Sequence, residues 1–82
     1  MKKETRDSLV RYAEDHIETG GFLRAVLVND FMEAVGRADA DNARDLCEIA
    51  RFIWNDIPAR CHGSYTIVNE WIMESPAAKG GA

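Results

Sequence analysis

The stretch Gly20-Gly21-Phe22-Leu23-Arg24-Ala25-Val26-Leu27-Val28-Asn29-Asp30-Phe31 decides how this chain folds. Its glycine pair separates two segments of helical periodicity, and glycine commonly ends a helix because it adopts the left-handed backbone conformation without steric cost. Asp30 follows Leu27 and Val26 by three and four residues, which places its carboxylate on the apolar side of the second segment. We therefore expect a helix on each side of the glycine turn, and Asp30 is the most unusual residue of the second.

The two helices beside the glycine pair follow from apolar spacing. The first is predicted over residues 5–18, with Thr5 as candidate N-cap and Thr19-Gly20-Gly21 as its end. Its stripe consists of Leu9, Tyr12, Ala13, His16 and Ile17. The second is predicted as a single helix over residues 22–36, ending near Gly36. Its stripe consists of Leu23, Val26, Leu27, Phe31, Ala34 and Val35.

A third helix, over residues 42–57, carries the strongest helical signal. Its apolar stripe consists of Ala43, Leu46, Cys47, Ala50, Ile53, Trp54 and Ile57. Asp39 or Asp41 supplies the N-cap. Pro58 closes the helix because proline lacks an amide proton and clashes with the preceding turn. As a large aromatic residue on the stripe, Trp54 is expected in the core.

A shorter fourth helix is predicted over residues 65–74, with Ser64 as its N-cap. Val68, Trp71 and Ile72 are expected to pack inward. The fold class is therefore all-α: a compact bundle of three main helices plus a shorter C-terminal helix. We expect one domain over residues 1–76 and a disordered tail of small residues over 77–82.

Composition limits the classes of function. The 82 residues are 46% hydrophobic and 29% charged, as in ordinary globular domains, and the formal net charge is −4. An acidic chain is a poor match for a protein that binds mainly to phosphates. The sequence has neither a long apolar run for a membrane span nor a signal-peptide pattern. With only Cys47 and Cys61, both expected as free thiols, the predicted location is the cytoplasm.

No motif for catalysis, cofactor or metal stands out. Cys61-His62 with Cys47 and His16 lacks zinc-ligand spacing, and adjacent Cys and His residues rarely face each other as a nucleophile and base. The segment Asp39-Ala40-Asp41-Asn42 starts like a calcium loop, but it lacks the central glycine and has Ala50 at the twelfth position. We therefore expect no enzyme, no cofactor and no metal.

Candidate binding residues come from charge and aromatic content. Asp30 is expected to be structural, bonded to a helix end or to an arginine such as Arg60; a polar place in a binding groove is the alternative. Residues 30–56 hold seven acids against three arginines. An acidic and apolar partner surface is therefore expected at Phe22, Asp30, Asp39, Asp41, Asp45, Glu48 and Phe52.

These residues also carry a family resemblance. The run from Gly20 to Asp30, Gly36-Arg37-Ala38-Asp39, Phe52-Ile53-Trp54-Asn55-Asp56 with Pro58, and Gly63-Ser64 leading to Glu70-Trp71-Ile72 together resemble a family of small uncharacterised proteins from tailed phages and prophages. The resemblance spans about residues 13–74. It implies a phage origin and thus the cytoplasm of a bacterial host as the location, and small phage accessory proteins often act by binding host or phage machinery.

The leading functional prediction is a small phage accessory protein that binds another protein, as a monomer or homodimer. Its partner would be a host or phage protein, such as a nucleic-acid-handling complex, and it would act as an inhibitor of a host defence system such as CRISPR–Cas. One alternative is a helix-turn-helix-like nucleic-acid-binding module, because Arg37, Arg44 and Arg51 recur every seven residues. Another is a phage structural or assembly adaptor.

Overall fold

The computed structural model describes residues 1–74. The elements, in order, are the helices α1 (Lys3–Asp15), α2 (Gly21–Leu27), α3 (Phe31–Arg37) and α4 (Ala40–Asp56), the 3-10 turn η1 (Ala59–Cys61) and helix α5 (Tyr65–Met73). Within the described residues no strand occurs, so the fold is all-α as predicted, although the helices are divided differently. The predicted tail over residues 77–82 lies outside the described part of the chain.

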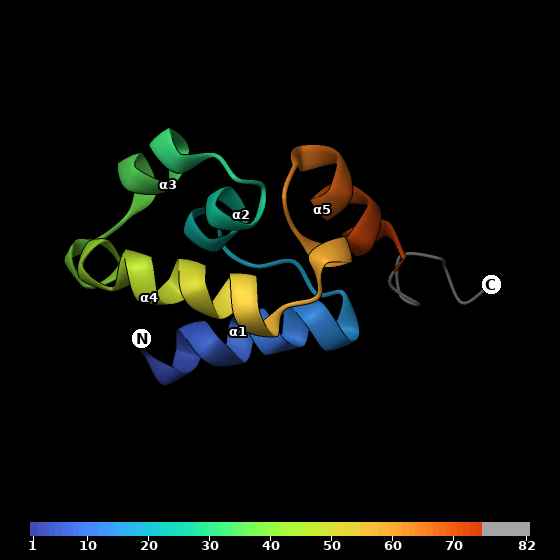
Figure 1. Ribbon diagram of the computed structural model, residues 1–82, viewed down its shortest axis with the longest axis horizontal. Helices are drawn as coiled ribbons and strands as arrows, with labels where there is room; N and C mark the ends of the chain where they lie inside the picture. The colour runs from blue at the N-terminus through green and yellow to red at the C-terminus, as the bar shows by residue number, and fades with distance from the viewer. Residues whose placement is uncertain (75–82) are drawn as a thin grey trace.

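Helices α1 and α4 lie side by side and run in the same direction, with α2 and α3 together on one side and η1 and α5 beyond the end of α4 (Figure 1). Contacts fix this parallel register: the Met1 ammonium group pairs with Glu48, and the Arg6 guanidinium lies over the Phe52 ring. The main hydrophobic cluster is formed by buried residues of α1, α2, α4, η1 and α5, and α3 adds the buried Ala34. The cluster includes Leu9, Tyr12, Leu23, Leu27, Ile49, Ile53, Val68 and Trp71.

The first helix ends three residues earlier than predicted, and no glycine ends it. α1 stops at Asp15, and His16 takes the left-handed conformation with φ 60°. The reason is a tertiary contact: Nδ1 of His16 lies 2.7 Å from the Trp71 carbonyl oxygen, and the two rings stack 3.9 Å apart. The prediction over residues 5–18 was wrong here, because packing against α5 outweighs the helical preference of the sequence.

The predicted single helix over residues 22–36 is two helices. Asn29 has the left-handed backbone conformation (φ 65°), which interrupts the helix between α2 and α3. Asp30 caps α3 by accepting a hydrogen bond from the Glu33 amide. The Leu27 carbonyl oxygen at the end of α2 accepts a 2.7 Å hydrogen bond from the Gly63 amide. The loop before α5 therefore holds the break in place.

The face that α4 turns to the core also differs from the prediction. Ile49, Ile53 and Ile57 are buried, whereas Trp54 is 79% exposed and Cys47 is exposed. Phe52, expected on the surface, is half-buried and packs against the core. The placement of Trp54 in the core was wrong because α4 has two adjacent apolar sides, and α1 packs on only one of them.

Two of the predicted N-caps are confirmed, whereas Thr5 is not a cap, because α1 begins at Lys3 and Thr5 lies inside it. Asp39 caps α4 through a 2.8 Å bond from the Asn42 amide, and Ser64 caps α5 through a 3.1 Å bond from the Ile67 amide. Side-chain oxygens satisfy backbone amides that have no partner inside the helix. Trp71 is buried as predicted, and its indole N–H donates to the Tyr12 carbonyl oxygen at 2.8 Å.

Candidate protein-binding groove

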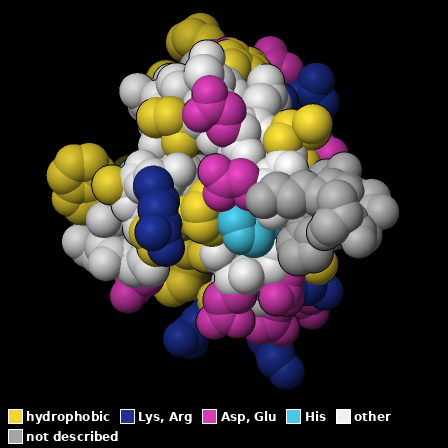
Figure 2. Space-filling model, turned by 90° about the vertical axis from the view of Figure 1, so that its right-hand side faces the viewer, with side chains coloured by type: hydrophobic (Ala, Val, Ile, Leu, Met, Phe, Trp, Pro, Cys, Tyr) yellow, Lys and Arg dark blue, Asp and Glu magenta, His cyan; other side chains and the backbone are white. Residues whose placement is uncertain are grey.

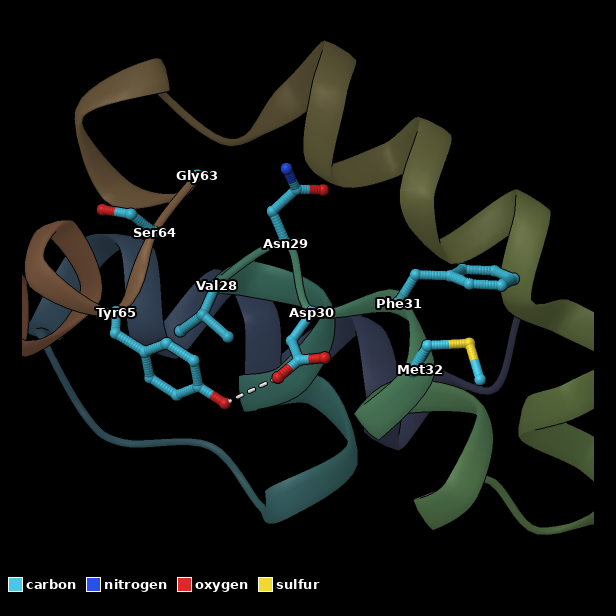
Figure 3. Close-up of a pocket in the computed structure, with 8 residues that line it drawn as sticks. All are labelled: Val28, Asn29, Asp30, Phe31, Met32, Gly63, Ser64 and Tyr65. Carbon is cyan, nitrogen blue, oxygen red and sulfur yellow. Dashed lines mark hydrogen bonds between the residues drawn. The ribbon is translucent and has the colours of Figure 1, made fainter.

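An apolar groove of about 540 Å³ lies between α3 and α4. Its lining comes from the end of α2, the first half of α3, the exposed side of α4 and the His62–Gly63 turn. The apolar residues among them are Val26, Leu27, Phe31, Ala34, Leu46, Cys47, Ala50, Ile53 and Trp54. Phe31 and Met32 point to the same side of α3, and the Phe31 ring lies toward α4 (Figure 3).

Large apolar side chains stand exposed at this groove. Trp54 is 79% exposed and Phe31 is 66% exposed, and both line the groove; Met32 and Val35 are also exposed on α3 but do not line it. A fully exposed aromatic side chain presents roughly 150–250 Å², so Trp54 and Phe31 leave on the order of 300 Å² of apolar surface in water. That area is within the range of the largest patch on a monomeric protein, and such patches commonly mark interaction sites.

The groove floor on α4 is made of small residues. Cys47 and Ala50 are exposed and line the groove between Leu46 and Trp54. Small side chains at a helix surface let another helix come close, because the distance between helix axes depends on the side chains at the contact. The groove therefore has small side chains on α4, Phe31 on α3 across from them, and Trp54 one turn beyond Ala50 along α4.

A smaller and more polar hollow of about 400 Å³ opens beside the groove around Asp30, Ser64 and Tyr65 (Figure 3). Both carboxylate oxygens of Asp30 are engaged: Oδ1 accepts from the Glu33 amide at 3.1 Å, and Oδ2 accepts from the Tyr65 hydroxyl at 2.9 Å. The hydrogen bond to Asp30 raises the pKa of Tyr65 above its usual value. The structural interpretation of Asp30 is thus supported, with its own helix start and Tyr65 as partners.

Arg60, named as a possible partner of Asp30, lies elsewhere, with its guanidinium 5.4 Å from the Trp71 ring centre.

The predicted acidic surface lies at the start of α4, beside the N-terminus of α1. Lys2 pairs with Asp41 at 3.1 Å and lowers the pKa of that carboxyl below its usual value. The Met1 ammonium group pairs with Asp45 and Glu48. The negative charges of Asp41, Asp45 and Glu48 are therefore paired with positive groups of the same chain. Asp39 serves as the N-cap of α4.

The structure separates the residues that were predicted to form one partner surface. Phe22 and Phe52 are half-buried against the core, and Asp30 lies beside Tyr65 of α5. The acids at positions 39–48 extend along the first half of α4. Whether any of them binds a partner stays a prediction.

Sequence reasoning missed the groove residues Phe31 and Trp54 as a site. One signal could have found Trp54: the apolar positions of α4 exceed what one buried side can hold.

The three arginines that suggested nucleic-acid binding differ in environment. Arg37 pairs with Glu33, and Arg44 pairs with Asp41 and Asp45, each at 3.3 Å. Arg51 lines the groove. At the α5 end of the molecule, the described residues mix acidic, basic and apolar side chains, with histidine among acidic groups (Figure 2). No charge of one sign dominates that face.

Within residues 1–74, no group of three or more His, Cys, Asp or Glu side chains lies close enough to hold a metal ion. In the same residues, no helix has both the length and the apolar character needed to cross a bilayer.

Comparison of the chain with protein-family models, with curated proteins and with solved structures found no match.

Proposed function

We propose that this chain is a non-enzymatic protein-binding module that takes an apolar helix of its partner into the groove between α3 and α4. The observation that carries the proposal is Trp54, a tryptophan left 79% exposed at the edge of a 540 Å³ apolar groove. Burying a tryptophan of this exposure is among the largest single gains that a protein interface can make, and tryptophan is enriched at binding hot spots.

The shape of the groove favours a helix as occupant. Two helices form its walls, and the small residues Cys47 and Ala50 form a floor on which a third helix can lie. Helix-in-groove binding uses apolar anchors every three or four residues, which would contact Phe31 on one wall and Trp54 on the other. The polar hollow at Asp30 and Tyr65 forms the rim, as polar residues commonly do around an apolar interface centre.

The phage origin and the inhibition of a host defence system such as CRISPR–Cas remain part of this proposal on the sequence resemblance alone. In that setting the partner is a host or phage protein, and binding would act by covering a surface that the partner needs.

Binding by a matched pair of variants tests the proposed function. Trp54→Ala removes the groove aromatic, whereas Met73→Ala removes a side chain on α5 that is 66% exposed and lies outside the groove. A protein captured from host lysate by the wild-type chain should be lost with Trp54→Ala and kept with Met73→Ala. Direct titration of the purified partner should show a loss of tenfold or more, the usual effect of a hot-spot residue. Equal binding by both variants would overturn the proposal.

A further inference from the structure

We propose that the helix occupying the groove is α4 of a second copy of this chain, so that two copies form a two-fold dimer through antiparallel α4 helices. This inference rests on the proposed function and names the partner. α4 is itself an amphipathic helix with a free apolar side, and this side forms one wall and the floor of the groove. The groove and a helix that fits it are therefore parts of the same surface.

The free side of α4 is a straight stripe. Ala43, Cys47, Ala50 and Trp54 follow one another at spacings of four, three and four residues, which places them on one line along a helix. All four are exposed, and none is charged. The side chains of this stripe are small at the first three positions and large at the last, Trp54.

Antiparallel pairing matches this size pattern. In a two-fold interface, a contact from one residue of the first copy to another residue of the second copy is always repeated with the two copies exchanged. With Ala50 near the two-fold axis, Trp54 of each copy lies on Cys47 and Ala43 of the other copy. Each of the two large side chains is therefore packed against small ones. A parallel pairing would place Trp54 against Trp54 and alanine against alanine, which leaves the small positions unfilled.

The area also fits a dimer. A stable interface of standard size buries about 800 Å² per partner and has an apolar centre. Trp54 and Phe31 provide on the order of 300 Å² of apolar surface for that centre, to which the exposed small residues of α4 add. Because α3 lies beside α4 along the groove, its exposed side chains would contact the partner's α4 as well. The paired acids Asp41 and Asp45 face the α1 N-terminus, so the net charge of −4 is not concentrated on this side.

Sedimentation velocity and a disulfide trap test the dimer together. At concentrations on the order of 100 µM, where micromolar associations are saturated, the wild-type chain should have twice its 9.2 kDa mass. Trp54→Ala should sediment as a monomer with an unchanged helical circular dichroism spectrum, and Met73→Ala should stay dimeric. In a Cys47→Ser background, Ala50→Cys should form a disulfide-linked dimer on mild oxidation. Thr66→Cys, on the exposed side of α5, should not.

Each result separates this inference from the proposed function. A wild-type chain that stays monomeric overturns the dimer, and the proposed function then stands if a captured partner is still lost with Trp54→Ala. A dimer that persists in Trp54→Ala, or in which Thr66→Cys crosslinks as well as Ala50→Cys, also overturns the inference, because it uses another face. If Trp54→Ala changes neither self-association nor partner binding, both proposals fail.

Discussion

Replacement of Tyr12 by phenylalanine tests a buried hydrogen bond between α1 and η1. The Tyr12 side chain is fully buried, and its hydroxyl donates to the Cys61 carbonyl oxygen at 2.6 Å. Phenylalanine keeps the ring and removes the donor, which leaves a buried carbonyl group without that partner. Such a loss costs about 1–3 kcal/mol of unfolding free energy. For a domain of this size, the expected fall in Tm is roughly 5–20 °C.

Thermal unfolding followed by circular dichroism at pH 7 measures this change. Tyr65→Phe is the matched control, because its hydroxyl bonds to Asp30 at an exposed site where water can replace the donor. We expect Tyr65→Phe to lower the unfolding free energy by less than about 1 kcal/mol. If Tyr12→Phe melts within a degree or two of the wild type, or no lower than Tyr65→Phe, the Tyr12 hydroxyl is not the buried anchor described above.

In dilute protein, Trp54→Ala should change the unfolding free energy by no more than about 0.5 kcal/mol, whereas Trp71→Ala should cost about 3–5 kcal/mol in urea unfolding; the reverse order would mean that α4 is turned the other way. Burial raises the pKa of Tyr12 and of Cys61 above their usual values near 10 and 9, so the unfolded chain loses these protons first. Stability should therefore be full below about pH 9 and fall as the pH rises above 9 to 10, and Tyr12→Phe should flatten this fall; a flat wild-type profile would contradict the burial. Asn29→Val should cost about 1–2 kcal/mol because φ is positive there, and Asn29→Gly should be near neutral in the same assay.

Local signals in the sequence predicted the helix class and the caps of α4 and α5, but not the start of α1. Asp39 and Ser64 cap their helices through short-range hydrogen bonds, which depend only on nearby residues. The end of α1 and the break before α3 depend instead on residues far along the chain. His16 leaves the helix to stack on Trp71, and the Gly63 amide bonds to the end of α2. Such contacts have no local pattern from which they could be predicted.

The candidate site was harder to predict than the fold, for a physical reason. Periodicity shows that an apolar stripe exists on α4, but it does not show what covers that stripe. The stripe that contains Ala50 and Trp54 was assigned to the core, and the structure leaves most of it exposed. The acids of α4 appeared unpaired in the sequence because their partners, Lys2 and the Met1 ammonium group, lie at the N-terminus, far from α4 along the chain.

The contacts of Tyr12 with η1 and α5 join segments that are far apart in the chain. The Tyr12 hydroxyl reaches a residue 49 positions later, and the Tyr12 carbonyl oxygen bonds to a residue 59 positions later. Closing a loop of this length costs on the order of 3–4 kcal/mol in chain entropy before any contact repays it. Folding should therefore be slower than in bundles whose helices pack on sequence neighbours. During synthesis, the part of α1 that contacts η1 and α5 therefore stays uncovered until these later elements have been made.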